Sequence, residues 1–424
     1  MRVLILTFGT RGDIEPFAVL AERLTRAGHV AVLAAPEPYR GLVSAAVGFE
    51  PMATEMDRVM RAGMTRLSGP RQAITLARQM AAGMRVSLRE QWAIAQRVQP
   101  TVIVAHPKAL GGLHVAERLR VPFVASIPLP FLTRTSAFPV PFLSRPLPGR
   151  LSRLSYEFNR FTALAYGGMI DTFRRDSLGL PPMGRFTDYL TTSAGAAVPV
   201  LYPFSRHVVP VPADYPGSAH VTGYWFGDPA PTWEPPRDLV SFLNGGSPVI
   251  YVGFGSMGFG GRSVERGRLV YEALRGVDVL GVRAVVSTGW GALSVEPSEH
   301  IYPLDEVPHE WLFSRVDAVV HHGGSGTTAA GLRAGKPTLV CPVLGDQPFW
   351  GRRVHELGAG PRPLPLRRAT SESLSGRIVD LISNAAYGAA ATVLSAQIAS
   401  EDGPGNAIRA LHQIELVAGQ RHDR

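Results

Sequence analysis

Two polar side chains, Asp13 and His106, each closely follow an apolar run that is typical of a buried parallel strand. The carboxyl ends of parallel strands meet at one edge of a sheet, where ligands bind, so these side chains can converge. A carboxylate beside an imidazole can take a proton from a hydroxyl group, so the pair predicts acid–base chemistry. The alternatives are structural: Asp13 can cap the helix that follows it, and a lone histidine is more often structural.

A glycine-rich segment, His321-His-Gly-Gly-Ser-Gly-Thr-Thr328, follows another strand-like run and opens a helical pattern. Glycines let several backbone N–H groups converge, and the helix N-terminus adds a positive partial charge. Thr327 and Thr328 offer hydroxyl groups, and His322 offers a hydrogen bond or a charge. The segment therefore predicts a diphosphate site, the alternative being a tight strand-to-helix turn with capping threonines.

Further polar groups lie near strand ends in the same half of the chain. Asp346 and Gln347, in Gly345-Asp-Gln-Pro348, come shortly after a run that ends at Cys341 and can bind sugar hydroxyls. Asp346 can instead cap the helix that begins near Pro348. Ser256 lies in a glycine-rich turn and can donate to a phosphate oxygen, although Gly-Ser turns are common.

Other nucleotide and metal sites have weaker support. Gly253-Phe-Gly-Ser-Met-Gly258 formally matches the dinucleotide fingerprint, but glycines continue the loop and no acidic residue clearly ends the next strand. We therefore interpret this segment as a turn and disfavour a dehydrogenase. The sequence has no P-loop, no D-x-D pair and no histidine ligand spacing, so we predict no metal site and no cofactor.

Strand-like runs alternate with helical patterns and would position these groups. The runs are residues 2–8, 29–34, 101–105, 122–126, 248–253, 283–287, 317–321 and 337–341. The first helix carries an apolar face and ends at Gly28; that face comprises Phe17, Leu20, Ala21 and Leu24. This rhythm is typical of doubly wound α/β sheets.

The chain has 424 residues, and single cores stop growing near ~250–300 residues, so we expect two domains. A Pro-rich break at Asp228–Pro236 separates two series of strands. We predict two Rossmann-like domains facing each other across a cleft: residues 1–227 and 248–404, joined by a linker at 228–247. Residues 405–424 are expected to form a helix that packs back on the first domain.

Two segments of the first half interrupt the strand pattern. Residues 56–99 are helical, amphipathic and Met-rich. Their methionines form plain core or line an adaptable apolar pocket: Met60, Met64, Met80 and Met84. Residues 128–148 are rich in proline and carry Phe131, Phe138 and Phe142, which indicates a shaped loop.

The composition is that of a globular protein, with 45% apolar and 18% charged residues. The net charge of +9 comes mostly from scattered arginines, which favours a solvated basic surface over a nucleic-acid site. A single cysteine excludes an intrachain disulfide. The sequence has no signal-peptide pattern and no run of ~18 apolar residues, so we expect a soluble, cytoplasmic protein and leave peripheral membrane contact open.

Over nearly its whole length the chain resembles family 1 glycosyltransferases of the GT-B fold. Gly9-Thr-Arg-Gly-Asp-Ile-Glu-Pro16 is similar to the N-terminal signature of bacterial antibiotic and sterol glycosyltransferases. The region from Val307-Pro-His309 through the His321 segment to Pro348 is similar to their donor-binding signature. His106-Pro-Lys-Ala-Leu-Gly-Gly112 and Pro128-Leu-Pro-Phe131 look more like the sterol glucosyltransferase branch than the glycopeptide branch.

The resemblance implies a metal-independent, inverting enzyme in which Asp13 deprotonates the acceptor hydroxyl. Plant relatives place a histidine at this position and an orienting aspartate near the position of His106, so the pair is exchanged here and the role of His106 is left open. Domain 1–227 would bind the acceptor and domain 248–404 the nucleotide-sugar.

The resemblance also implies a set of ligand contacts. His322 and its turn would hold the diphosphate with help from Ser256, and Asp346 and Gln347 would hold the sugar. The full predicted donor set is Thr10, Arg11, Gly255, Ser256, Val307, His322, Gly324, Ser325, Gly326, Thr327, Asp346 and Gln347. The predicted acceptor set is Met60, Met64, Met80, Met84, Phe131 and Phe138.

We therefore expect transfer from a UDP- or dTDP-sugar to a hydroxyl of a lipophilic acceptor, either a polyketide or macrolide aglycone or a sterol. One alternative is a nucleotide-sugar 2-epimerase-like enzyme of the same fold, against which the long Met-rich and Pro-rich insertions argue. Another is a non-catalytic nucleotide-sugar-binding partner protein, against which the presence of Asp13 and His322 argues.

Overall fold

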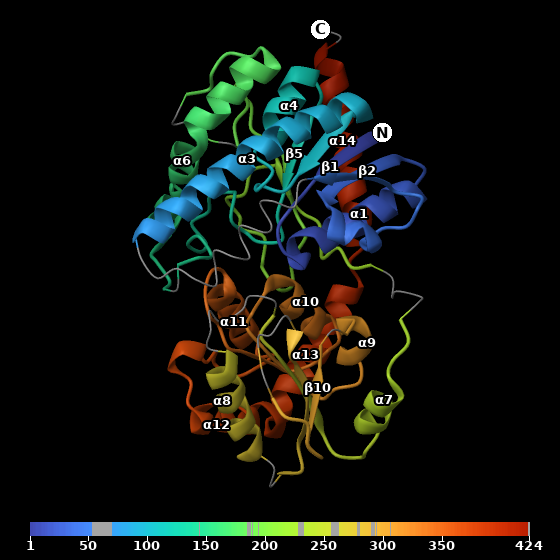
Figure 1. Ribbon diagram of the computed structural model, residues 1–424, viewed down its shortest axis with the longest axis vertical. Helices are drawn as coiled ribbons and strands as arrows, with labels where there is room; N and C mark the ends of the chain where they lie inside the picture. Colours follow the sequence, from blue (N-terminus) through green and yellow to red (C-terminus); the bar gives the residue numbers. More distant parts are fainter. Residues whose placement is uncertain are drawn as a thin grey trace.

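The computed structural model describes residues 1–422 apart from 53–69, 144, 185–187, 189, 194, 228–232, 256–262, 278–279, 290–292, 294 and 306. The described chain forms two parallel-sheet α/β domains, stacked one above the other in Figure 1. The predicted fold class is thus confirmed.

The first domain contains a seven-stranded sheet in the order β3-β2-β1-β4-β5-β6-β7. Its strands are β1 (Arg2–Leu6), β2 (Val30–Pro36), β3 (Gly48–Met52), β4 (Val102–Ala105), β5 (Phe123–Ser126), β6 (Val200–Tyr202) and β7 (Ala219–Val221). The chain runs outward from β1 to β3 and then crosses to β4 on the other side of β1, where Leu6 pairs with Ala105. This crossing is the switch point at which ligands bind in such sheets.

Helices cover both faces of this sheet. They are α1 (Arg11–Arg26), α3 (Pro70–Val98), α4 (Gly112–Leu119), α5 (Gly149–Ser155) and α6 (Phe158–Phe173), with a 3-10 turn η1 (Glu37–Leu42) and a π turn η2 (Arg174–Leu178). The apolar face of α1 is buried through Phe17, Leu20 and Leu24. The helix ends before Gly28, whose φ of +82° is a conformation that glycine adopts without steric cost.

The second domain contains a five-stranded sheet in the order β10-β9-β8-β11-β12. Its strands are β8 (Val249–Gly253), β9 (Arg283–Ser287), β10 (Ile301–Leu304), β11 (Ala318–His321) and β12 (Thr338–Val340). Its helices are α7 (Arg237–Leu243), α8 (Ser263–Arg275), α9 (His309–Phe313), α10 (Ser325–Arg333), α11 (Gln347–Glu356), α12 (Ser371–Ser383) and α13 (Ala385–Ala399), with a 3-10 turn η5 (Leu366–Arg368). The switch point lies between β8 and β11, where Gly253 pairs with His321.

The boundary between the domains differs from the predicted linker at 228–247. Residues 237–243 of that range form α7, and Leu239 is fully buried in a core cluster with Val249 and Phe313 of the second domain. The prolines mark a break in the sequence, but the buried Leu239 that follows them belongs to the core of the second domain.

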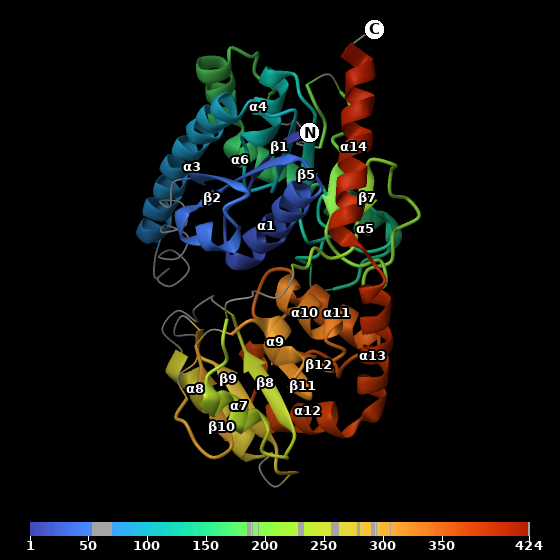
Figure 2. The ribbon, with the colours of Figure 1, turned by 90° about the vertical axis from the view of Figure 1, so that its right-hand side faces the viewer.

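The chain returns to the first domain at its end through α14 (Gly403–His422). Ala407 and Leu411 of α14 are buried in the same cluster as Phe17 of α1, and Figure 2 shows α14 beside the first domain and α13 beside the second. In the part of the chain that the structure describes, no single helix is long and apolar enough to cross a membrane. One pair of helical segments, Ser371–Ser383 and Ala385–Gln420, has the length and apolar composition of a membrane span, but it is bent by 66°.

Candidate functional site

Asp13 lies in the first turn of α1, just beyond the carboxyl end of β1. The helix begins at Arg11 and its N-cap is Thr10, so Asp13 is not the N-cap residue considered from the sequence. Its Oδ2 atom accepts hydrogen bonds from the backbone N–H of Thr10 (2.8 Å) and the Thr10 hydroxyl (2.9 Å). The loop requires Gly9, since it has φ +133° and a Cβ there would lie 2.4 Å from Oδ2 of Asp13. Asp13 therefore supports the helix start and still has its Oδ1 atom available.

His106 and Lys108 complete this cluster from the end of β4. The Lys108 ammonium lies 2.7 Å from Oδ2 of Asp13, and Nε2 of His106 lies 3.5 Å from Oδ1. Nδ1 of His106 accepts a hydrogen bond from the backbone N–H of Lys108 (3.1 Å). A neutral imidazole that accepts at Nδ1 carries its proton on Nε2, so His106 presents a donor to Asp13.

The protonation states follow from burial and from charge. Burial lowers the pKa of His106 to about 3, so this side chain is neutral near pH 7. Burial alone would raise the pKa of Asp13, but the charge and hydrogen bond of Lys108, together with His106 and Thr10, hold it below its ordinary value. The cluster therefore presents a carboxylate as its base and a neutral imidazole as its neighbour.

The predicted diphosphate segment forms the loop from β11 into α10. Nδ1 of His321 accepts the backbone N–H of Gly323 (2.9 Å), and the Thr328 hydroxyl donates to the Gly324 carbonyl (2.9 Å). Both hydrogen bonds shape the loop, which ends at the first turn of α10. In that turn Thr327 is half-buried and Gly326 is exposed. Backbone N–H groups at such a helix start favour anions.

The His322 ring lies between two glycines of this loop system. A Cβ at Gly255 would lie 2.6 Å from Cε1 of His322, and a Cβ at Gly324 would lie 2.7 Å from its Nε2, so larger residues would displace the ring. Burial lowers the pKa of His322 to about 4, an effect that the Gly253 carbonyl partly offsets. Without a ligand His322 is therefore neutral at pH 7. The sequence suggested that this side chain offers either a hydrogen bond or a positive charge, and the neutral ring offers the hydrogen bond.

Ser325, predicted as a donor contact, bridges the two domains. Its hydroxyl donates to the backbone carbonyl of Pro128 in the first domain (2.8 Å). A hydrogen bond donated by this hydroxyl to a nucleotide-sugar would require the bond to Pro128 to break. Ser325 therefore links the loop between β11 and α10 to the Pro-rich loop of the first domain.

Asp346 precedes α11, and its carboxylate makes no side-chain hydrogen bond that would cap this helix. Oδ2 instead accepts the indole N–H of Trp350 (2.8 Å), and burial raises the pKa of Asp346 above its ordinary value. Oε1 of the buried Gln347 accepts the backbone N–H groups of Val343 (2.7 Å) and Leu344 (3.1 Å). That oxygen is therefore used to hold the loop, and Asp346 is the better placed of the two predicted sugar contacts.

Charged groups of the two domains act on one another's pKa values. The Asp13 carboxylate and the Lys108 ammonium both act on the pKa of Asp346, in opposite directions and after the larger effects of burial and hydrogen bonding. Burial lowers the pKa of His309, on α9, to about 4, with smaller contributions from Glu15 and Arg11 of the first domain. The predicted base and the predicted sugar contact thus belong to one electrostatic environment.

The other predicted donor contacts fall into different surroundings. Arg11 is exposed and pairs with Glu15 (2.9 Å), at the start of α1. Val307 is half-buried against the core cluster that contains Phe313. Ser256 lies outside the described residues.

The predicted acceptor residues separate into two groups. Phe131 and Phe138 are partly buried against a core cluster that draws residues from both domains, and the Phe138 ring lies 5.8 Å from that of Phe349 on α11. Met84 is buried in the core with Leu88, which favours the plain core interpretation over a place in an acceptor pocket. Met80 is half-buried on α3, and the predicted contacts Met60 and Met64 lie outside the described residues.

The structure adds three groups that the sequence did not single out. Lys108 neutralises Asp13, Trp350 holds Asp346, and His309 stacks on Phe313 with ring centroids 4.5 Å apart. The position of Lys108 two residues after His106 was the only signal for it in the sequence. Among the described residues, no group of three or more His, Cys, Asp and Glu side chains could hold a metal ion.

Comparison with known proteins places this geometry in a family. Residues 3–139 match the model of the glycosyltransferase family 28 N-terminal domain, and residues 294–414 match that of the erythromycin biosynthesis protein CIII-like C-terminal domain. Over 97% of its length the chain is 34% identical to sterol 3-beta-glucosyltransferase UGT80B1 of Arabidopsis thaliana, covering 68% of that protein. The chain belongs to the GT-B glycosyltransferases. The resemblance of the signature segments to this family is therefore confirmed.

A second relative of this GT-B glycosyltransferase and a solved structure support the same assignment. The chain is 35% identical to UGT80A2 of the same plant over 97% of its own length, and it spans 65% of the length of that relative. The solved structure of the glycotransferase of kitacinnamycin has the same fold, with a TM-score of 0.72, 18% identity and coverage of 97% of this chain and 98% of the other.

Proposed function

We propose that this GT-B glycosyltransferase moves a sugar from a nucleotide-sugar to a hydroxyl group of a lipophilic acceptor, with inversion at the anomeric carbon. The observations that support this most directly are the Asp13–Lys108–His106 cluster of the first domain and the effect that Asp13 and Lys108 have on the pKa of Asp346 in the second domain. A base from one domain and a sugar contact from the other are the two parts that such a transfer needs.

In this proposal Oδ1 of Asp13 accepts the proton of the acceptor hydroxyl. Oδ2 already receives three donors, two from Thr10 and one from Lys108. His106 is a poor candidate for the base because its Nδ1 atom is engaged by the backbone of Lys108. The neutral Nε2–H of His106 instead orients the carboxylate.

The acceptor oxygen attacks the anomeric carbon as the bond from that carbon to the diphosphate oxygen breaks. The electron pair of that bond leaves with the nucleoside diphosphate, and the hydroxyl proton passes to Asp13. The N–H groups at the start of α10 and the neutral His322 stabilise the negative charge of the leaving group. Asp346 holds a sugar hydroxyl, and binding both substrates in line lowers the entropic part of the barrier.

The names of the Arabidopsis relatives support a sterol as acceptor, and UDP- and dTDP-sugars are the donors to compare first. The test is to incubate the chain with each donor, with and without a sterol or a polyketide aglycone, and to measure nucleotide release and the anomeric configuration of the product. Acceptor-dependent release with inversion is expected. Conversion of the donor to its 2-epimer without any acceptor would favour the epimerase-like alternative, and tight donor binding without turnover would favour a non-catalytic partner protein.

The proposed transfer uses no resident metal ion. N–H groups, hydroxyls and His322 stabilise the negative charge of the diphosphate. Activity is expected to survive EDTA, and complete loss in EDTA that Mg²⁺ or Mn²⁺ restores would overturn this part of the proposal.

A further inference from the structure

We propose that a surface formed by the segment just before α5, by α5 and by the start of α6 binds an anionic lipid bilayer and that the acceptor enters the protein from the membrane beside it. This surface, here called the α5–α6 face, consists of exposed apolar and basic side chains: Phe142, Leu143, Arg145, Arg150, Leu151, Arg153, Leu154, Phe158 and Arg160. The entry of the acceptor rests on the proposed function, whereas the lipid contact does not.

The apolar part of the face follows one side of a helical path. Leu151, Leu154 and Phe158 are spaced by three and four residues, and they are 51%, 60% and 49% exposed. The backbone between the two helices stays right-handed at Tyr156 and Glu157, so the spacing keeps these side chains on one side. Single exposed apolar residues are common on protein surfaces, but a contiguous group of them marks a surface that binds a protein, a ligand or a membrane.

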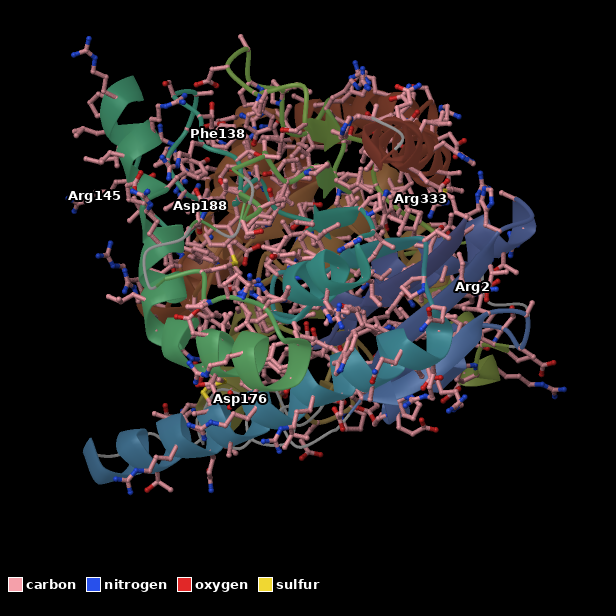
Figure 3. All side chains as sticks on the ribbon, turned by 90° about the horizontal axis from the view of Figure 1, so that it is seen from above. Arg2, Phe138, Arg145, Asp176, Asp188 and Arg333 are labelled. Atoms are coloured by element: carbon pink, nitrogen blue, oxygen red, sulfur yellow. The ribbon has the colours of Figure 1, made fainter. Side chains whose placement is uncertain are left out.

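Arginines lie beside this apolar row. Residues 142–164 contain four arginines and one acidic residue, Glu157, which is already paired with Arg134 (2.9 Å) and Arg160 (3.0 Å). Figure 3 shows the Arg145 side chain at the outer edge of the molecule, near α5, while Phe138 lies further in. Basic side chains flanking an apolar row on an amphipathic helix are typical of contact with anionic lipid headgroups.

A row of aromatic rings connects the α5–α6 face with Phe131, one of the predicted acceptor-binding residues. The Phe158 ring lies 6.3 Å from that of Phe142, which lies 5.0 Å from that of Phe131. The Phe131 carbonyl also accepts a hydrogen bond from the Asn159 side chain (3.2 Å), so the Pro-rich loop and α6 are held together. A lipophilic acceptor leaving a bilayer at this face would therefore meet an apolar route toward the domain interface.

The charge of the face favours lipid over a second copy of this chain. Arg153 also contacts Asp214 of a neighbouring loop (3.4 Å), and the face still carries an excess of positive charge. Two copies meeting through the same face would bring eight arginines together against two glutamates and two aspartates, and like charges at an interface are unfavourable. An anionic bilayer instead complements these charges and accepts the leucines between its headgroups.

The test uses flotation of the protein with vesicles of phosphatidylcholine alone or mixed with phosphatidylglycerol. Leu151→Ser/Leu154→Ser removes the apolar row of α5, and Leu416→Ser/Val417→Ser is a matched control, since those side chains are 66% and 50% exposed on α14. The wild type and the control should bind the anionic vesicles, the α5 variant should bind at least about tenfold less, and Arg150→Gln/Arg153→Gln should lose the preference for anionic lipid. Equal binding by the α5 variant, or no binding by the wild type, would overturn the proposal. A wild-type dimer by light scattering that the α5 variant dissociates would assign the face to a second copy.

A second measurement tests the route of the acceptor. Sugar transfer to an acceptor embedded in anionic vesicles should fall in the α5 variant, whereas transfer to the same acceptor in detergent should equal that of the wild type. Equal transfer from vesicles would overturn the entry route. If the wild type transfers sugar to no acceptor in either form, the proposed function fails while the flotation result still decides the lipid contact.

Discussion

The Lys108 ammonium lies 2.7 Å from Oδ2 of Asp13, while the other carboxylate oxygen faces the neutral His106 ring. The two oxygens of the Asp13 carboxylate therefore have different roles. Oδ2 is held by Lys108 and Thr10, and Oδ1 is left for the acceptor. In this account Lys108 is a positioning residue that keeps Asp13 ionised.

Replacing Lys108 with methionine is expected to move the acidic limb of the kcat–pH profile to higher pH. Burial raises the pKa of Asp13 and Lys108 opposes that effect, so removing the ammonium raises this pKa. The active form is the carboxylate, so activity is then lost at a higher pH than in the wild type. Lys336→Met, which changes the only other lysine of the chain, is the control. An unshifted acidic limb in a folded Lys108→Met protein would remove Lys108 from the site.

Replacing His322 with alanine is expected to weaken the binding of nucleoside diphosphate and of every nucleotide-sugar. A hydrogen bond to a charged group contributes about 1.5–3 kcal/mol, which corresponds to a loss of roughly 10- to 150-fold in affinity. Because burial lowers the pKa of His322 to about 4, the affinity difference should be nearly constant from pH 6 to pH 8 unless the donor itself protonates the ring. Calorimetry with His220→Ala as control checks this, and equal affinities of His322→Ala and the wild type would refute the diphosphate assignment.

Replacing Asp346 with asparagine separates sugar binding from nucleotide binding. The amide oxygen of the new side chain can still accept the Trp350 N–H, but the charge is lost, so KM for the nucleotide-sugar should rise by about one order of magnitude. The affinity for the free nucleoside diphosphate should stay unchanged. Trp350→Phe keeps an aromatic ring and removes only the N–H that holds Asp346, so it should shift KM in the same direction. A parallel loss of affinity for the free nucleotide in Asp346→Asn would contradict a sugar contact.

The main features of the fold were predictable from the sequence because its central strands are continuous apolar runs. Buried runs such as Val3–Leu6 and Val249–Val252 read as strands without any knowledge of their neighbours. β6 and β7, with three residues each, were not predicted because pairing at the edge of the sheet, and not their own pattern, makes them strands. The meeting of Asp13 and His106 was predictable because each follows a strand of the same sheet.

The surroundings of Gln347 and Met84 depend on contacts that only the folded chain creates. Gln347 holds two backbone N–H groups that the 342–346 loop brings to it, and Met84 faces the core because of how α3 lies on the sheet. A lone lysine after a strand is usually solvated, so the position of Lys108 after His106 was not enough to assign it to Asp13.

The most direct test of the account is the turnover number of Asp13→Asn, measured with nucleotide affinity and melting temperature. The amide oxygen of the asparagine can still accept the Thr10 N–H that supports the start of α1, but the side chain cannot take the acceptor proton. A general base contributes roughly 10²–10⁴-fold, so kcat should fall by that factor while nucleotide affinity and folding persist. Asp13→Asn/Lys108→Met is the companion variant, since it also removes the unpaired ammonium and should be as inactive as the single variant. Turnover near the wild-type value in a folded Asp13→Asn protein would contradict the account and exclude Asp13 as the base.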